Sequence, residues 1–154
     1  MDITRGLGKV SSRSSFINLE NIFALNDTNE AAVSNVDCVA IGLASSEFSF
    51  QKRLPGWDKE SYGYHGDDGA IFHGRGYRLA EYGPRFGPGD TVGCGINYTT
   101  RTIFFTLNGL FLGDAFYSVE GSLFPTVGID AAVDISLNFG RAPFKFDLGQ
   151  YIIN

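Results

Sequence analysis

The stretch from residue 90 to residue 139 constrains the fold of this chain most strongly, because apolar residues alternate along it with small or polar ones. Val92 and Ile96 share one parity, and polar or glycine residues take the other. A period of two is typical of a strand with one buried face. Asn108 and Gly109 separate two such runs, and this dipeptide favours a tight β-hairpin. The stretch therefore predicts three or four antiparallel strands in an all-β core.

The parity of these strands also predicts which side chains lie in the core. We expect four of them to point inward between two sheets: Val92, Ile96, Phe105 and Ile135. Each would bury apolar area worth about 1.5–3 kcal/mol. Downstream, the alternation over residues 144–146 predicts a short closing strand.

Composition agrees with one globular β domain and excludes two classes of partner. The 154 residues allow one domain, and 20 glycines with 14 phenylalanines suit aromatic-rich strands joined by tight turns. A net charge of −5 with scattered basic residues argues against nucleic acid, which requires a concentrated basic face. No apolar run approaches the ~18 residues of a membrane-spanning helix.

Location follows from the N-terminus and the cysteines. Residues 1–15 contain no apolar core of a secretory signal, so none is predicted in this chain. Cys38 and Cys94 fall within expected strands, where they are explained as small buried hydrophobes in a reducing compartment. We therefore expect a cytoplasmic or nuclear location.

The chain divides into two regions of unequal clarity. Residues 1–36 form a poorly defined N-terminal extension, in which the apolar spacing of residues 16–25 suits a short helix about as well as an edge strand. Residues 37–154 form the predicted β domain. If an edge strand were missing, exposed backbone donors would invite self-association.

Catalysis and metal binding find little support. Asp67, Asp68 and Glu81 lie near aromatic residues, but Asp68 is explained by its turn before glycine, and glycoside hydrolysis needs two carboxyls at a defined gap. His65 and His73 flank a turn without a third ligand at a recognisable spacing. The sequence therefore predicts no enzyme, no cofactor and no metal.

The remaining candidate is a display of aromatic and cationic side chains on loops. Trp57 follows a Pro-Gly turn, where a tryptophan is either a core residue or a binding hot spot. Arg53 and Arg101 add guanidinium groups that suit carboxylate or backbone contacts. This favours a peptide-binding surface. The alternative is a lectin-like, glycan-binding sandwich in which Trp57 and Tyr77 stack on sugar rings.

Several motifs resemble those of a known family. They are Gly42 with Leu43 and residues 53–59, 61–69, 82–84, 89–94, 104–109, 123–128 and 138–140. Over residues 37–151 the chain resembles a SPRY domain, and specifically the branch of Ran-binding protein M (RanBPM). The N-terminal segment is atypical, since residues 1–36 do not match the strand that the family places there.

The resemblance implies a bent antiparallel β-sandwich, of concanavalin-like type, that binds short peptide motifs of partner proteins at one rim. It implies no catalysis and no cofactor. RanBPM-like proteins are scaffold or adaptor subunits of a ubiquitin ligase complex, and related SPRY domains occur as secreted effectors. The expected peptide-binding residues are Arg53, Leu54, Pro55, Gly56, Trp57, Tyr62, Thr99, Arg101, Ile129, Asp130 and Ala131. We expect Arg53, Trp57, Thr99, Arg101 and Asp130 to share one face.

Overall fold

The computed structural model describes residues 16–23, 38–51, 53–74, 76–130 and 135–153, which contain ten strands and one helix. The strands are β1 (Phe16–Phe23), β2 (Cys38–Ala44), β3 (Ser61–His65), β4 (Ala70–His73), β5 (Arg78–Glu81), β6 (Thr91–Asn97), β7 (Thr102–Leu107), β8 (Leu110–Phe116), β9 (Phe124–Asp130) and β10 (Ile135–Asn138). The helix is α1 (Leu148–Ile153). Within these residues, no helix is long and apolar enough to cross a membrane.

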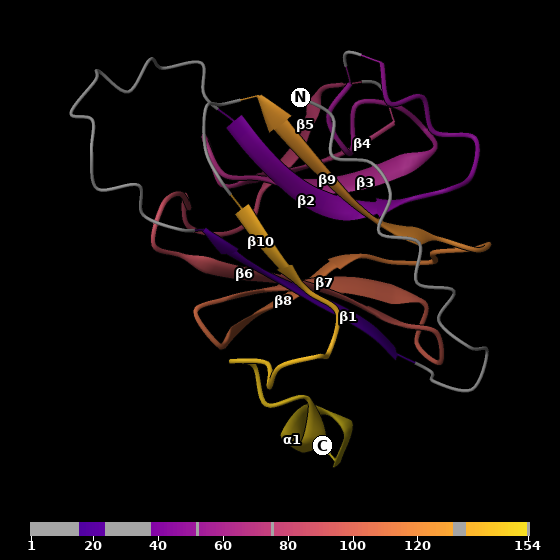
Figure 1. The fold of residues 1–154 in the computed structure, drawn as a ribbon. Coiled ribbons are helices and arrows are strands. Elements are labelled where there is room, and N and C mark those ends of the chain that lie inside the picture. The colour runs from indigo at the N-terminus through magenta and orange to yellow at the C-terminus, as the bar shows by residue number, and fades with distance from the viewer. Residues whose placement is uncertain (1–15, 24–37, 52, 75, 131–134, 154) are drawn as a thin grey trace.

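The strands form two antiparallel sheets that lie face to face (Figure 1). The first sheet has the order β10-β1-β6-β7-β8, and the second has the order β5-β4-β3-β2-β9. In Figure 1 the second sheet lies above the first, and their strands curve around a shared interior. The predicted fold class, an all-β bent sandwich, is confirmed.

The stretch from residue 90 to residue 139 contains five strands rather than three or four. Four of them, β6, β7, β8 and β10, belong to the first sheet, whereas β9 pairs with β2 in the second. The chain changes sheets between β8 and β9. Alternation identifies a strand, but it does not say which sheet the strand joins.

The sandwich interior contains the side chains that strand parity predicted. Val92, Ile96 and Phe105 are at most 1% exposed, and half-buried Ile135 packs against the same cluster. Tyr64 reaches them from the second sheet, with its ring centroid 5.2 Å from that of Phe105. The predicted core is confirmed.

Residues 16–23 form a strand. The apolar spacing of residues 16–25 leaves a short helix and a strand open, and the structure shows the strand. β1 pairs with β6 on one side and with β10 on the other, so it is an interior strand of the first sheet. The expectation of an edge strand is therefore wrong, and the condition stated for self-association is not met at this position. Residues 1–15 and 24–36 lie outside the described residues, and the boundary at residue 37 stays a prediction.

The outer face of the first sheet is covered by the C-terminal segment. Phe104 points away from the interior, yet it is 1% exposed, because its ring lies 5.8 Å from that of Phe146 and 4.7 Å from that of Tyr151. In Figure 1, α1 lies below the first sheet, on the side away from the second. The predicted closing strand at residues 144–146 is wrong, because Phe146 instead packs as a cover over Phe104.

The β7–β8 connection is the hairpin that its dipeptide predicted. Asn108 and Gly109 have φ values of 51° and 84°, which a tight turn of this type requires. The Asn108 side chain also accepts a hydrogen bond from the Thr91 backbone N–H at 2.8 Å. The hairpin is thereby attached to the start of β6.

Candidate functional site

Residues 53–58, here called the Trp57 loop, cross the outer face of the second sheet. Glycines on that face allow the close approach. A Cβ added at Gly63 would lie 2.0 Å from the Pro55 carbonyl oxygen, and one at Gly128 would lie 2.6 Å from Leu54 Cδ2. Leu54 is buried on this face. The start of the loop is therefore packed directly onto β3 and β9.

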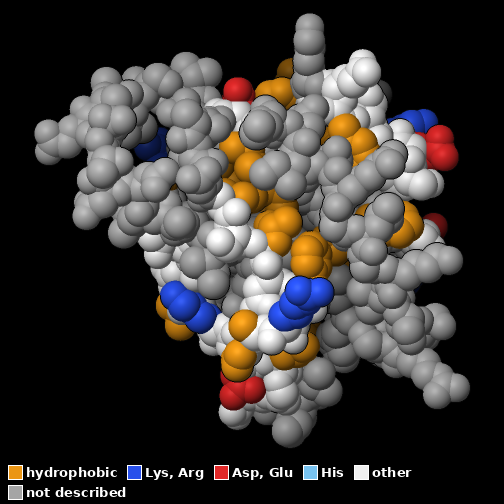
Figure 2. All heavy atoms as spheres, in the orientation of Figure 1, with side chains coloured by type: hydrophobic (Ala, Val, Ile, Leu, Met, Phe, Trp, Pro, Cys, Tyr) orange, Lys and Arg blue, Asp and Glu red, His pale blue; other side chains and the backbone are white. Residues whose placement is uncertain are grey.

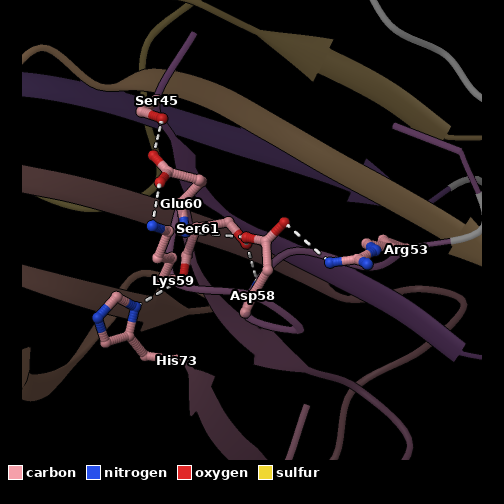
Figure 3. A network of polar contacts seen from close by, with 8 residues as sticks. Ser45, Arg53, Asp58, Lys59, Glu60, Ser61 and His73 are labelled. Carbon is pink, nitrogen blue, oxygen red and sulfur yellow. Dashed lines mark hydrogen bonds and ion pairs between the residues drawn. The ribbon is translucent and has the colours of Figure 1, made fainter. Parts of the chain in front are cut away.

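A polar network fixes the other half of the Trp57 loop (Figure 3). One carboxylate oxygen of Asp58 accepts from the Glu60 backbone N–H at 2.9 Å and from the Ser61 hydroxyl at 3.0 Å. The Ser61 oxygen in turn accepts from the Gly56 N–H at 2.8 Å. The other Asp58 oxygen pairs with Arg53 at 3.4 Å. The backbone on both sides of Trp57 is therefore held before any partner binds.

We expect Gly63→Ala to displace the Trp57 loop, since the added methyl would meet a backbone oxygen that cannot rotate away. Overpacking of this kind costs about 1–3 kcal/mol. Urea denaturation with tryptophan fluorescence measures the loss. The matched control is Gly87→Ala, where a Cβ would have no neighbour within 4 Å. Equal midpoints for the two variants would contradict the packed position of the loop.

Trp57 itself is neither a core residue nor fully free. Its side chain is 37% exposed, and its ring centroid lies 6.1 Å from that of His65. Gly76 lies close to the Trp57 side chain. The residue after it, Tyr77, is 77% exposed. The ring is therefore presented partly exposed on a fixed backbone.

Exposure alone would not single out this tryptophan. Other large hydrophobic side chains are exposed too, including Tyr117, Phe124 and Phe139. Figure 2 shows one face of the molecule, on which apolar side chains extend from the upper edge to the centre, and basic and further apolar side chains lie below them. What distinguishes Trp57 is the loop backbone, which packing and hydrogen bonds hold on both sides.

The predicted site residues within the loop have different roles. Arg53 is exposed, with a guanidinium that pairs with Asp58 at the surface. Leu54, Pro55 and Gly56 are buried, so they support the loop rather than offer side chains to a partner. Arg53 and Trp57 are therefore the residues of this loop whose side chains a partner could contact.

Thr99 and Arg101 lie in the β6–β7 turn and are exposed. The Asn97 side chain accepts from the Thr99 N–H at 3.0 Å, and Arg101 has a φ of 56°. Arg101 Nη1 lies 3.1 Å from Glu120 Oε1, and its carbonyl accepts from the Val119 N–H. This turn is therefore attached to the connection between β8 and β9.

Tyr62 belongs partly to the core. Its ring stacks on His73 at 4.0 Å between centroids and meets Phe116 edge-on at 5.0 Å. Burial raises the pKa of its hydroxyl, and the carboxylates of Glu120 and Glu60 add to the rise. The same Glu120 pairs with Arg101 of the β6–β7 turn.

The predicted residues at the end of β9 lie apart from that turn. Ile129 packs into the sandwich core, and Asp130 is the exposed last residue of β9, paired in register with Cys38. The partners of Arg101 precede the first residue of β9, so Asp130 lies at the opposite end of this strand. Ala131 lies outside the described residues. A single face shared by all five predicted rim residues stays a prediction.

One cluster was not predicted from the sequence. Cys38 Sγ lies 3.8 Å from His65 Nδ1 and 3.2 Å from Asp67 Oδ1, although the residues are 27 and 29 positions apart. Burial raises the pKa of the Cys38 thiol, as does the Asp67 carboxylate, and burial lowers the pKa of His65. Cys38 and Cys94 are both buried free thiols. The sequence carries no local signal for this cluster, because it depends on the register that pairs the start of β2 with the end of β3.

The candidate carboxylates for catalysis have structural roles. Asp68 accepts from the Ala70 N–H at 2.9 Å and pairs with Arg78 at 3.2 Å, so it closes the turn between β3 and β4. Glu81 is exposed and also pairs with Arg78. The predicted turn role of Asp68 is confirmed.

Comparison with known proteins assigns the class. The SPRY domain model matches residues 30–142. A crystal structure of a human SPRY domain superimposes with a TM-score of 0.67 at 27% identity, covering 82% of this chain and 78% of that one. The SPRY domain of human HERC1 superimposes with a TM-score of 0.65 at 17% identity, covering 84% and 78%, and shows the fold alone.

Curated relatives narrow the class to one branch. "Ran-binding proteins 9/10 homolog" of Drosophila melanogaster is 48% identical over 71% of this chain, and human "Ran-binding protein 9" is 45% identical over 74%. "Ran-binding protein M homolog" of Arabidopsis thaliana is 41% identical over 73%. The matches cover 11%, 16% and 24% of these relatives, respectively. The chain belongs to the SPRY domain family, in its RanBPM-like branch. This membership supports a protein-interaction module, the role that SPRY domains generally have.

Proposed function

We propose that the domain binds short peptide segments of partner proteins, with Trp57 as the principal anchor. The observation that carries the proposal is a partly exposed tryptophan on a loop whose backbone is already fixed on both sides. Tryptophan is enriched among hot spots of binding. A loop that is ordered before binding avoids the entropic cost of ordering it on contact.

Cationic and hydroxyl groups would hold the peptide backbone or its acidic side chains. Arg53 pairs with Asp58 at an exposed site and at 3.4 Å, an interaction weak enough to be exchanged for a partner carboxylate. Thr99, Arg101 and Tyr62 would extend the surface at the β6–β7 turn. Asp130, the last residue of β9, and Ala131, which follows it in the sequence, would complete the proposed rim, and Ile129 would support Asp130 from the core.

The place of this module in a larger protein is also a proposal. The relatives are several times longer than the matched region. We propose a non-catalytic adaptor role in the cytoplasm or nucleus. There the domain would recruit partners to a scaffold, such as a RanBPM-like ubiquitin ligase subunit, or act as an effector.

A glycan-binding function is the second candidate, because Trp57 and the strongly exposed Tyr77 lie in neighbouring segments. Two aromatic rings side by side can stack on sugar rings. Parallel screening on a carbohydrate array and on a peptide array separates the candidates. Binding to glycans without any peptide would replace the proposed function.

The partner is identified by pull-down with the whole chain, followed by mapping of the recovered proteins with overlapping peptides. Arg101→Ala then tests how far the surface extends. A peptide that reaches the β6–β7 turn should lose about 1.5–3 kcal/mol of binding, the range for a hydrogen bond to a charged group. The control is Arg141→Ala, which is also exposed. Unchanged affinity for Arg101→Ala would confine the surface to the Trp57 loop.

A further inference from the structure

The cluster of Cys38, His65 and Asp67 lies where β2 begins and β3 ends. Their ligand atoms, a thiol sulfur, an imidazole nitrogen and a carboxylate oxygen, all lie within 4.8 Å of one another. Cys38 and His65 are buried, whereas Asp67 is exposed. The three atoms therefore converge on one point with access from solvent on the Asp67 side.

Two of their three separations are close to those of zinc ligands. Tetrahedral zinc, with Zn–S of about 2.3 Å and Zn–N or Zn–O of about 2.0–2.1 Å, places its ligand atoms roughly 3.4–3.6 Å apart. The measured separations are 3.8 Å from Cys38 Sγ to His65 Nδ1 and 3.2 Å from Cys38 Sγ to Asp67 Oδ1. Shifts of a few tenths of an ångström in these two separations, together with closure of the His65–Asp67 separation, which is at most 4.8 Å, would complete the geometry.

The His65 ring is already in the tautomer that a metal requires. Its Nε2 lies 2.7 Å from the Pro55 carbonyl oxygen, which can only accept, so Nε2 carries the hydrogen. Nδ1, on the side of Cys38, is therefore left with its lone pair. Metal-bound histidines commonly donate their other N–H to a backbone carbonyl in this way.

We propose that Cys38, His65 and Asp67 form a zinc-binding site with a fourth position open to water or a further carboxylate. A mixed sulfur, nitrogen and oxygen set suits zinc, whereas calcium and magnesium prefer oxygen ligands alone. Asp130 is the register partner of Cys38, so its side chain projects from the same face of the sheet. The proposal does not rest on the peptide-binding function, although the Trp57 loop and Asp130 lie close to both sites.

The same three residue types do not form a nucleophilic triad. In a triad the carboxylate orients the histidine, and the histidine activates the thiol. Here the carboxylate lies against the thiol, and the Pro55 carbonyl orients the histidine. A carboxylate beside a buried thiol opposes formation of the thiolate, whereas a cation between the two groups would favour it. The arrangement therefore fits a cation and not nucleophilic catalysis.

Zinc at this point would also stabilise the Trp57 loop. The His65 ring connects the cluster to Pro55, and it stacks on Phe72 at 4.1 Å between centroids. Trp57, the only tryptophan of the chain, lies 6.1 Å from the same ring. Its fluorescence therefore reports on occupancy of the site.

The test is titration of the whole chain with Co²⁺, followed by displacement with Zn²⁺. We expect one ion per chain, a thiolate-to-cobalt absorption band, a change in Trp57 fluorescence, and no response to Ca²⁺ or Mg²⁺. Loss of a group that only hydrogen-bonds to a metal ligand typically lowers metal affinity ~10–100-fold. Cys38→Ala, which removes a ligand itself, should lower zinc affinity by more than this, whereas Cys94→Ala should leave zinc affinity unchanged. Circular dichroism confirms that each variant is folded.

A second pair of variants keeps the test valid if Cys38→Ala does not fold. Asp67 is exposed, so Asp67→Asn should fold and yet lose affinity, whereas Asp68→Asn should retain it. The absence of a thiolate band, or equal zinc affinity in wild type and Asp67→Asn, would overturn the proposal. In that case Cys38 only donates a hydrogen bond to Asp67.

Discussion

Deletion of residues 1–25 is expected to abolish folding of the domain. The deletion removes β1, which pairs in register with β6 from Phe16 to Ile22 and with β10 from Glu20 to Phe23. Without it, β6 and β10 would each expose a row of unpaired backbone groups in the middle of the first sheet. The domain would also lose the strand that connects β10 to the rest of that sheet. Loss of the far-ultraviolet strand signal and of a cooperative urea transition would show the effect.

Deletion of residues 1–15 alone is the matched control. These residues contain no apolar periodicity, so their removal should leave the urea midpoint nearly unchanged. A folded chain after deletion of residues 1–25 would contradict the place of β1 in the sheet. Unfolding after deletion of residues 1–15 would show that this segment supports the fold.

Phe105→Ala is expected to destabilise the domain by about 3–5 kcal/mol, the usual cost of truncating a buried phenylalanine. Phe105 is fully buried at the centre of the sandwich. Its ring lies 5.2 Å from that of Tyr64, 5.8 Å from that of Tyr82 and 6.3 Å from that of Phe116. The truncation would therefore leave a cavity between both sheets.

The loss is large against the total stability of a domain, which is about 5–15 kcal/mol. Urea denaturation at equilibrium measures it. Phe139→Ala is the control, because Phe139 is 46% exposed and its truncation leaves no closed cavity. A midpoint equal to that of wild type for Phe105→Ala would mean that β7 presents its other face to the interior.

Local patterns predicted the strands well, because parity and turn residues act over a few positions. The alternation of Val92 and Ile96 and the Asn108 turn each required only neighbouring residues. The pairing of strands depends on distant segments. Parity could therefore not show that β9 joins β2, or that β1 lies between β6 and β10.

Local patterns also could not predict that the outer face of a sheet is covered by another segment. Phe104 and Phe105 are neighbours and both are buried, one under the C-terminal segment and one in the core. Alternation assigns one buried face to a strand, so it could not predict the second cover. The alternation at residues 144–146 looked like a strand because a packed aromatic cover has a similar composition.

The candidate site was predictable in part. The Pro-Gly turn before Trp57 indicated a rigid loop, and the structure adds the glycines that receive it. The cluster at Cys38 was not predictable from spacing, because it depends on the register that pairs Ala40 with His65. Ligands brought together by strand pairing give no signature along the chain.

The most direct test of the proposed function is Trp57→Ala, measured for two quantities on one variant. Calorimetric titration with the mapped peptide should show a loss of about 2 kcal/mol or more, roughly 30-fold in affinity. Urea denaturation should show a much smaller loss of stability than Phe105→Ala gives, since the Trp57 ring is 37% exposed. Tyr117→Ala, at another exposed aromatic residue, should change neither quantity. Unchanged affinity, or a loss of binding that accompanies unfolding, would contradict Trp57 as the peptide anchor.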